Sequence, residues 1–177
     1  MRKVVRALIP LLLLFSLMAT PAYATVATVE GRIYTYETGF TPGDQIPAGR
    51  CPAQAMWMLH LAGFGEMREF GTFTFENSHC SWIVEPIPGG AKGSLGNGSM
   101  VMTFDDTGDQ LFVAYEGQWR FVGDFSTGLG EVEVRQSVTF AGGTGIFEGA
   151  TGHGRLDGHG VDGFYPLRLV ATIELDD

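Results

Sequence analysis

Apolar and polar side chains alternate along much of this chain, which is the pattern of β-strands whose two faces meet different surroundings. In residues 131–140, three valines and Phe140 share one face, while glutamate, arginine and hydroxyl side chains occupy the other. Residues 167–175 repeat the pattern, with Leu167, Leu169, Ala171 and Ile173 on one face. Both segments are therefore predicted to be strands with one buried face.

Weaker alternation predicts further strands at 26–36, 55–62, 70–76, 79–85, 99–104, 111–116, 118–125 and 145–156. Glycine and aspartate clusters separate many of them, as expected for short turns. About eight to ten strands with almost no helix fit an all-β domain, either a sandwich or a closed antiparallel β-barrel of about eight strands. We favour the barrel because closure removes exposed strand edges.

Two segments interrupt this pattern. Residues 38–49 hold two prolines and three glycines and are expected to form a long surface loop. The glycine-rich stretch 89–98 fits either a mobile loop or a strand kinked by glycine, and the pattern alone does not separate the two.

The first 24 residues have the pattern of a secretory signal peptide. Arg2, Lys3 and Arg6 precede an apolar stretch, and Ala22-Tyr23-Ala24 provides small residues for cleavage after residue 24. The apolar stretch is too short for a membrane-spanning helix and contains proline. We therefore expect a single domain, residues 25–177, that is secreted or periplasmic and has no membrane anchor.

Composition adds limits on the partners of this domain. The formal net charge is −9, and removal of the three basic leader residues would make it more negative. This sign disfavours nucleic acids and anionic membrane surfaces as partners. The 26 glycines are interspersed with apolar and aromatic residues, so a folded core is still expected.

The sequence contains two cysteines, Cys51 and Cys80. In an oxidising compartment such a pair is expected to form a disulfide, which would stabilise the fold by about 3 to 4 kcal/mol. The alternative is a catalytic thiol assisted by His79, but neighbouring residues of a strand point to opposite faces. The two cysteines also lack the close spacing of structural zinc sites.

One motif combines a strand with a glycine-rich reversal. Residues 138–152 read Val-Thr-Phe-Ala-Gly-Gly-Thr-Gly-Ile-Phe-Glu-Gly-Ala-Thr-Gly. Glycine can adopt positive φ in a tight reversal and can permit a bulge or coiling in the strand that follows. Apolar residues on both sides of the turn can then be buried. A phosphate-binding loop is disfavoured, because no helix start and no Lys-Ser/Thr pair follows.

This motif resembles the Gly-Gly-Thr-Gly-x-Phe-x-x-Ala-x-Gly signature of dirigent and allene oxide cyclase-like barrels, and a more diffuse similarity extends over residues 59–156. Residues 106–111 and the glycine-rich stretch before them are similar to bacterial secreted members. The resemblance implies an eight-stranded barrel around an apolar cavity, often trimeric in the plant families. Thr151 stands where plant dirigent proteins have arginine, and their acidic and arginine site residues have no clear counterpart, so no catalytic residue is carried over.

Candidate metal sites are weak. His153 and His159 would lie about 20 Å apart on one extended strand, and would face one another only if Asp157-Gly158 made a hairpin turn. Asp105, Asp106 and Asp109 cluster in one turn but lack the spacing of a calcium-binding EF-hand loop. We therefore predict no metal, and the absence of a nucleophile-elbow motif argues against a serine hydrolase.

A barrel of this size can hold one small molecule or be filled by its own side chains. The residues expected to line such a cavity are Trp57, His60, Phe104, Tyr115, Trp119 and Gln136. Each has a plainer explanation as well: the aromatic residues can fill the core, Gln136 can bond to a neighbouring strand, and His60 can be a satisfied core or surface histidine.

Two classes of function follow. In the first, a secreted barrel accommodates a small apolar, aromatic or phenolic molecule and steers its cyclisation or coupling without a cofactor, as a cyclase or isomerase would. In the second, the barrel interior is filled and the protein has a structural or protein-interaction role, including assembly into a homo-oligomer. The sequence leaves open whether the protein is an enzyme.

Overall fold

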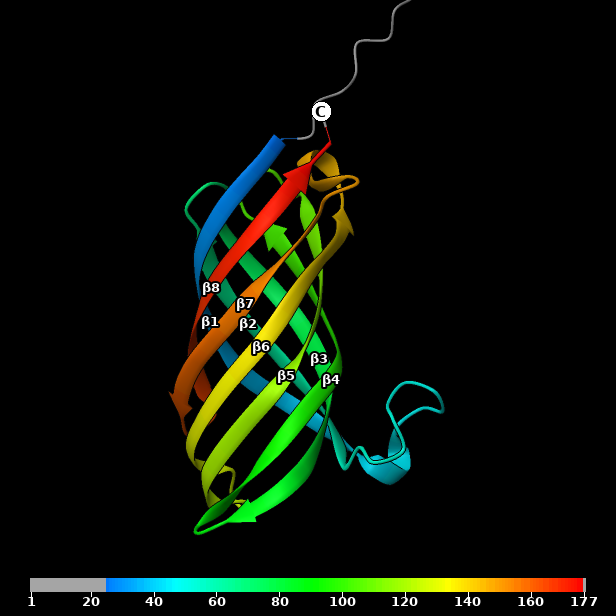
Figure 1. The fold of residues 1–177 in the computed structure, drawn as a ribbon, viewed down its shortest axis with the longest axis vertical. Coiled ribbons are helices and arrows are strands. Elements are labelled where there is room, and N and C mark those ends of the chain that lie inside the picture. Colours follow the sequence, from blue (N-terminus) through cyan, green and yellow to red (C-terminus); the bar gives the residue numbers. More distant parts are fainter. Residues whose placement is uncertain (1–24, 177) are drawn as a thin grey trace, which may run out of the picture.

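The computed structural model describes residues 25–176, so the predicted signal peptide lies outside the described residues. Within these residues, eight strands follow one another, with two short 3-10 helices between them (Figure 1). The strands are β1 (Thr25–Pro42), β2 (Trp57–Met67), β3 (Gly71–Ile87), β4 (Gly90–Phe104), β5 (Gln110–Asp124), β6 (Leu129–Gly143), β7 (Thr151–Val161) and β8 (Phe164–Leu175). The helical turns are η1 (Gly43–Gln45) and η2 (Gly145–Phe147).

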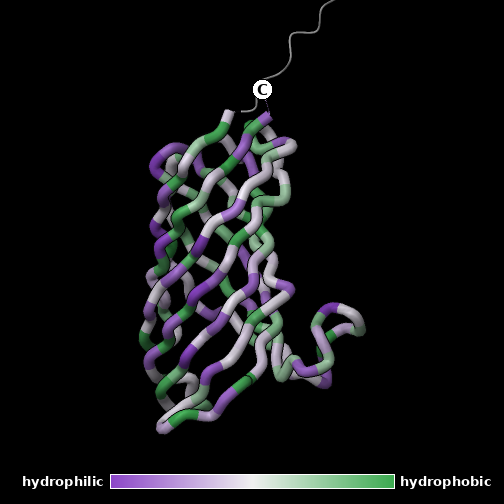
Figure 2. The backbone as a smooth tube through the Cα atoms, in the orientation of Figure 1, coloured by the Kyte–Doolittle hydropathy of each residue, from purple (hydrophilic) through white to green (hydrophobic). Residues whose placement is uncertain are grey.

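The strands form one closed antiparallel ring. Each strand pairs with the next along the chain, and β1 pairs with β8 to complete the barrel. This confirms the predicted all-β architecture of eight antiparallel strands. Side chains alternate between the lumen and the outside, and hydropathy alternates correspondingly along the strands (Figure 2). On β1, for example, Val29, Ile33 and Thr35 are buried while Glu30 and Arg32 are exposed.

Several predicted strand boundaries were wrong because the real strands are longer. Segments 70–76 and 79–85 are parts of β3, and 111–116 and 118–125 are parts of β5. Of the two alternatives for the glycine-rich stretch, the strand is correct, since β4 begins at Gly90. The predicted loop at 38–49 is also shorter, because β1 continues to Pro42. The predicted strand 145–156 instead begins as η2, and β7 starts at Thr151.

The segment between β1 and β2 is fastened to the outside of the barrel. Cys51 forms the predicted disulfide with Cys80 on β3, with 5.6 Å between their Cα atoms. Arg50 donates to the Asn97 carbonyl at 2.7 Å, and the Asn97 amide donates back to the Arg50 carbonyl at 2.9 Å. Asn97 has a φ of 50° at an irregularity in the pairing of β4 with β5. These contacts hold the segment beside one end of the barrel.

The opposite end of the barrel is the one at which β1 begins and β8 ends (Figure 1). Aromatic rings fill it. Phe70 precedes β3, Phe104 ends β4 and Phe147 ends η2, so three different connections contribute. The Phe147 ring centroid lies 5.1 Å from that of Phe70 and 4.8 Å from that of Phe104. Phe73 packs against Phe104 at 5.4 Å. We call these four residues the aromatic plug.

Among residues 25–176, no helix is both long enough and apolar enough to cross a membrane.

Candidate functional site

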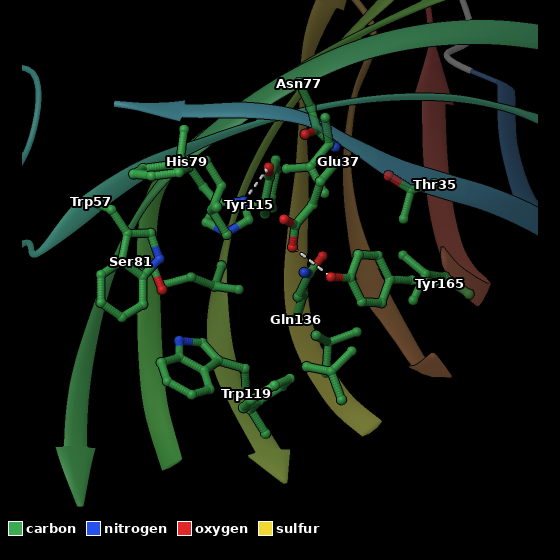
Figure 3. A pocket seen from close by; sticks show the side chains of 18 of the residues that line it. Thr35, Glu37, Trp57, Asn77, His79, Ser81, Tyr115, Trp119, Gln136 and Tyr165 are labelled. Atoms are coloured by element: carbon green, nitrogen blue, oxygen red, sulfur yellow. Dashed lines mark hydrogen bonds between the residues drawn. The ribbon is translucent and has the colours of Figure 1, made fainter. Parts of the chain in front are cut away.

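The other end of the barrel is hollow. A cavity of about 390 Å³ opens between the strand ends that lie near the β1–β2 connection and the β5–β6 turn. The side chains that line it come from β1 to β8, from Met56 and from the β5–β6 turn (Figure 3). Its apolar lining consists mainly of Phe40, Trp57, Leu59, Leu61, Phe75, Leu95, Met100, Trp119, Phe121, Val132, Val134, Leu156 and Leu167. The lumen is thus plugged at one end and open at the other.

Apolar side chains also surround the mouth of the cavity. Phe40, Met56 and Phe125 line it and yet are 67%, 49% and 49% exposed. Large apolar groups that remain in water cost free energy, and clusters of them are typical of binding surfaces. The mouth is therefore suited to admit an apolar molecule.

Glycines on one strand make room for the aromatic rings of the next. Gly93 faces Trp119 across β4 and β5, and a Cβ at Gly93 would lie 2.1 Å from a carbon of the indole ring. Gly98 faces Tyr115 in the same way, at 2.6 Å. The indole Nε1 of Trp119 donates to the Ser94 carbonyl at 3.2 Å, which fixes the ring. These glycines explain how wide rings fit inside a narrow barrel.

A buried histidine and tyrosine form the first polar pair of the cavity. His79 on β3 and Tyr115 on β5 are 6% and 5% exposed, and both line the cavity. The Nδ1 atom of His79 lies 3.0 Å from the Tyr115 hydroxyl, within hydrogen-bonding distance (Figure 3). The pair places one imidazole nitrogen and one phenol in an otherwise largely apolar wall.

Burial keeps this pair uncharged. Desolvation, with a smaller contribution from the positive charge of Arg50, lowers the pKa of His79 from 6.5 to about 4. Desolvation also raises the pKa of Tyr115 far above its ordinary value, although Arg50 opposes this shift. At neutral pH the pair therefore consists of a neutral imidazole and a neutral phenol.

A second polar pair lies between β1 and β8. The Tyr165 hydroxyl donates to Oε1 of Glu37 at 2.5 Å, and both residues line the cavity (Figure 3). Desolvation, followed by the hydrogen bond to Glu37 and its negative charge, raises the pKa of Tyr165 well above its ordinary value. Glu37 itself is exposed, so its carboxylate is accessible to solvent at the mouth.

Two amide side chains complete the polar lining. The Oδ1 atom of Asn77 is buried without a hydrogen-bond partner among the described residues. Gln136 on β6 is 8% exposed and lines the cavity. A buried amide oxygen without a partner costs free energy, and a ligand that supplies the missing hydrogen bond to Asn77 would recover it.

Four of the six predicted lining residues do line the cavity: Trp57, Tyr115, Trp119 and Gln136. His60 and Phe104 do not. The residues of β2 that face the barrel lumen alternate along the strand: Trp57, Leu59 and Leu61. His60 lies between two of them and therefore faces outward, where its Nε2 atom lies 3.0 Å from the Thr41 hydroxyl oxygen. Phe104 belongs to the aromatic plug at the other end.

Sequence reasoning missed Glu37, Asn77, Ser81 and Tyr165, and it considered His79 only as the helper of a thiol. Strand parity contains the missing signal. The buried positions Val29, Ile33 and Thr35 continue directly to Glu37, but the predicted strand stopped at residue 36. On β3, separate strands were predicted at 70–76 and 79–85, so the inward row that runs from Phe75 through Asn77 to His79 was not recognised.

The candidate metal sites do not form in the described part of the chain. His153 and His159 lie on the exposed outer face of one uninterrupted strand, β7, so the hairpin that would bring them together is absent. Asp105 instead accepts a hydrogen bond from Thr72 at 2.7 Å. Within residues 25–176, no three His, Cys, Asp or Glu side chains are grouped so that they could hold a metal ion.

Comparison with known proteins adds no relative. No family model, curated protein or solved structure matches the chain. The similarity of residues 138–152 to dirigent and allene oxide cyclase-like barrels therefore stays a prediction.

Proposed function

We propose that this protein binds one small, mainly apolar or aromatic molecule in the open half of its barrel. The observation that carries the proposal is the cavity of about 390 Å³, which has aromatic walls and a few inward-facing polar groups. Small-molecule sites have this composition, and their volumes begin at about 300 Å³. Burying about 200 Å² of apolar ligand surface would contribute about 5 kcal/mol before the cost of association.

The same proposal places the protein outside the cytoplasm. The leader-like residues 1–24 and the Cys51–Cys80 disulfide both support export. Kinship with the dirigent and allene oxide cyclase-like barrels, and assembly into a homo-oligomer, are parts of the proposal that rest on the sequence resemblance alone.

A catalytic version of this function is the second candidate, and the His79–Tyr115 pair favours it. A neutral imidazole can accept a proton, and a phenol hydrogen-bonded to it can donate one. A rigid apolar cavity would restrict a bound molecule to few conformers, which is how a cyclisation or isomerisation can be steered. In this version the chain needs no cofactor of its own.

The binding function is tested by narrowing the cavity. Val134 lines the cavity, whereas Ser137 on the same strand is exposed on the outer face. We expect the neutral dye N-phenyl-1-naphthylamine to show saturable fluorescence enhancement with the parent protein and with Ser137→Trp. Val134→Trp should weaken this binding at least about tenfold, because the indole would occupy space that the dye needs.

Circular dichroism and thermal melting serve as the folding control for these variants. Val132→Trp, which narrows the cavity at another lining position, replaces Val134→Trp if the latter does not fold. Absence of saturable binding by the folded parent protein, or equal binding by the cavity and surface variants, would contradict the proposal.

A further inference from the structure

The chemistry of the cavity also specifies what kind of molecule it accepts. We infer that the ligand carries a protonated amine on its aromatic or apolar body, and that Glu37 and Asn77 bind this amine. This inference rests on the proposed binding function and adds the charge of the ligand to it.

The first observation is the sign of the charge in the cavity. Of the described residues that line it, Glu37 is the one Asp, Glu, Lys or Arg. Its position continues the inward-facing row of β1 that runs through Ile33 and Thr35, so the carboxylate belongs to the lumen side of the strand. The carboxylate is accessible to solvent at the mouth, where it attracts a cation that approaches the cavity, although less strongly than a fully buried charge would.

The second observation is an acceptor that lacks a donor. Oδ1 of Asn77 is buried and has no hydrogen-bond partner among residues 25–176. Glu37 pairs with Leu61 of β2, and Leu61 pairs with Asn77 of β3, so the two acceptors flank Leu61 in one row. Strands two apart are separated by about 10 Å, so a polar group that contacts both side chains would lie over the inward-facing Leu61. An ammonium group has three N–H donors and can serve both acceptors.

The remaining polar groups of the lining offer an anion no positive charge. His79 is neutral above about pH 4, and the Tyr115 and Tyr165 phenols are neutral at physiological pH. Arg50 influences the His79–Tyr115 pair from outside the lining, where its guanidinium donates to the Asn97 carbonyl and to the Ser78 hydroxyl. A carboxylate ligand would therefore meet the like charge of Glu37 without a salt-bridge partner among the lining residues.

The aromatic walls are compatible with the same ligand. Tyr165, whose hydroxyl donates to Glu37, places an aromatic ring beside the carboxylate. Such rings attract cations through their negative faces, and they pack against aromatic bodies as well. An arylalkylamine would contact the apolar walls with its ring and the acceptors Glu37 and Asn77 with its ammonium group, whereas a fatty-acid-like anion would match only the apolar walls.

Three probes that share one ring system test the inference by isothermal titration calorimetry at pH 7. They are 1-naphthylmethylamine, which is cationic, 1-naphthalenemethanol, which is neutral, and 1-naphthoate, which is anionic. We expect the amine to bind about tenfold more tightly than the alcohol, and the naphthoate to bind more weakly than both.

Glu37→Gln should remove most of the preference for the amine over the alcohol, because the carboxamide has no negative charge to attract the ammonium group. The matched control is Glu76→Gln, which removes one negative charge from the exposed outer face of β3. This control should keep the preference for the amine, since the carboxylate of Glu76 lies on the solvent side of the strand, where salt screens it.

The outcomes separate the inference from the proposed function. Binding of the alcohol and naphthoate as tight as that of the amine, or an unchanged amine preference in Glu37→Gln, would overturn the inference while the binding function stands. If none of the three probes binds the folded protein, the binding function itself fails. If Glu76→Gln lowers amine affinity as much as Glu37→Gln does, the preference reflects net charge and the inference is again overturned.

Discussion

Phe147→Ala is expected to lower the free energy of unfolding by about 3 to 5 kcal/mol, which is the usual cost of removing a buried phenylalanine ring. Phe147 is 0% exposed and its ring contacts both Phe70 and Phe104. The substitution would open a void in the aromatic plug, where three chain connections meet. Urea denaturation followed by tryptophan fluorescence measures the change.

Ile146→Ala is the matched control for this prediction. Ile146 lies beside Phe147 in η2 but is 52% exposed, so its truncation should change the free energy of unfolding by less than about 0.5 kcal/mol. Similar small effects of both substitutions would show that the plug contributes little to stability. Phe147→Ala should leave the dye affinity of the folded protein unchanged, because the plug and the cavity occupy opposite ends of the lumen.

The second large effect is a loss of stability in acid. The pKa of His79 is about 4 in the folded protein, against an ordinary value of 6.5. Between these values the unfolded state binds more protons than the folded state. The part of the free energy of unfolding that depends on neutral His79 is fully present above pH 6.5 and is lost as the pH falls to 4. The shift in the pKa of His79 corresponds to a loss of about 3 kcal/mol.

Comparison with His79→Gln isolates this contribution from the titration of the carboxylates. The variant keeps a polar side chain of similar size at this position but does not titrate. Urea denaturation of both proteins at pH 7 and pH 4.5 should show a larger loss for the parent, by about 2 kcal/mol. Equal losses in the two proteins would mean that His79 does not remain neutral in the folded state.

Alternation of side chains was sufficient to predict an all-β domain, because each face of a strand meets one environment over most of its length, and the cost of exposed strand edges favoured a barrel over a sandwich. The pairing of Cys51 with Cys80 was equally predictable, since the sequence has two cysteines behind a leader-like segment. The strand ends were less predictable. Inward glycines such as Gly93 weaken the hydrophobic signal, although their function is to make room for a facing aromatic ring.

The prediction of the site was limited in a similar way by what alternation does not show. Gln136 was found because it lies on the otherwise apolar face of a clearly alternating segment, and Trp57, Tyr115 and Trp119 because they are aromatic residues of predicted strands. In the sequence, Phe104 is an aromatic residue of a predicted strand, just as the aromatic residues that line the cavity are. The closed topology places it at the plugged end of the barrel instead. Glu37 was missed because a charged residue normally ends a predicted apolar row, whereas in an open lumen it continues that row.

The central claim is that one half of the lumen is a binding site and the other half is filled. Titration of ¹⁵N-labelled protein with 1-naphthalenemethanol, followed by two-dimensional NMR, tests it directly. The claim predicts saturable shifts of the Trp57 and Trp119 indole signals and of the backbone amides of His79, Tyr115 and Gln136, with the amides of Phe73, Phe104 and Phe147 unchanged. Shifts concentrated at the aromatic plug, or no saturable shifts at all, would contradict it.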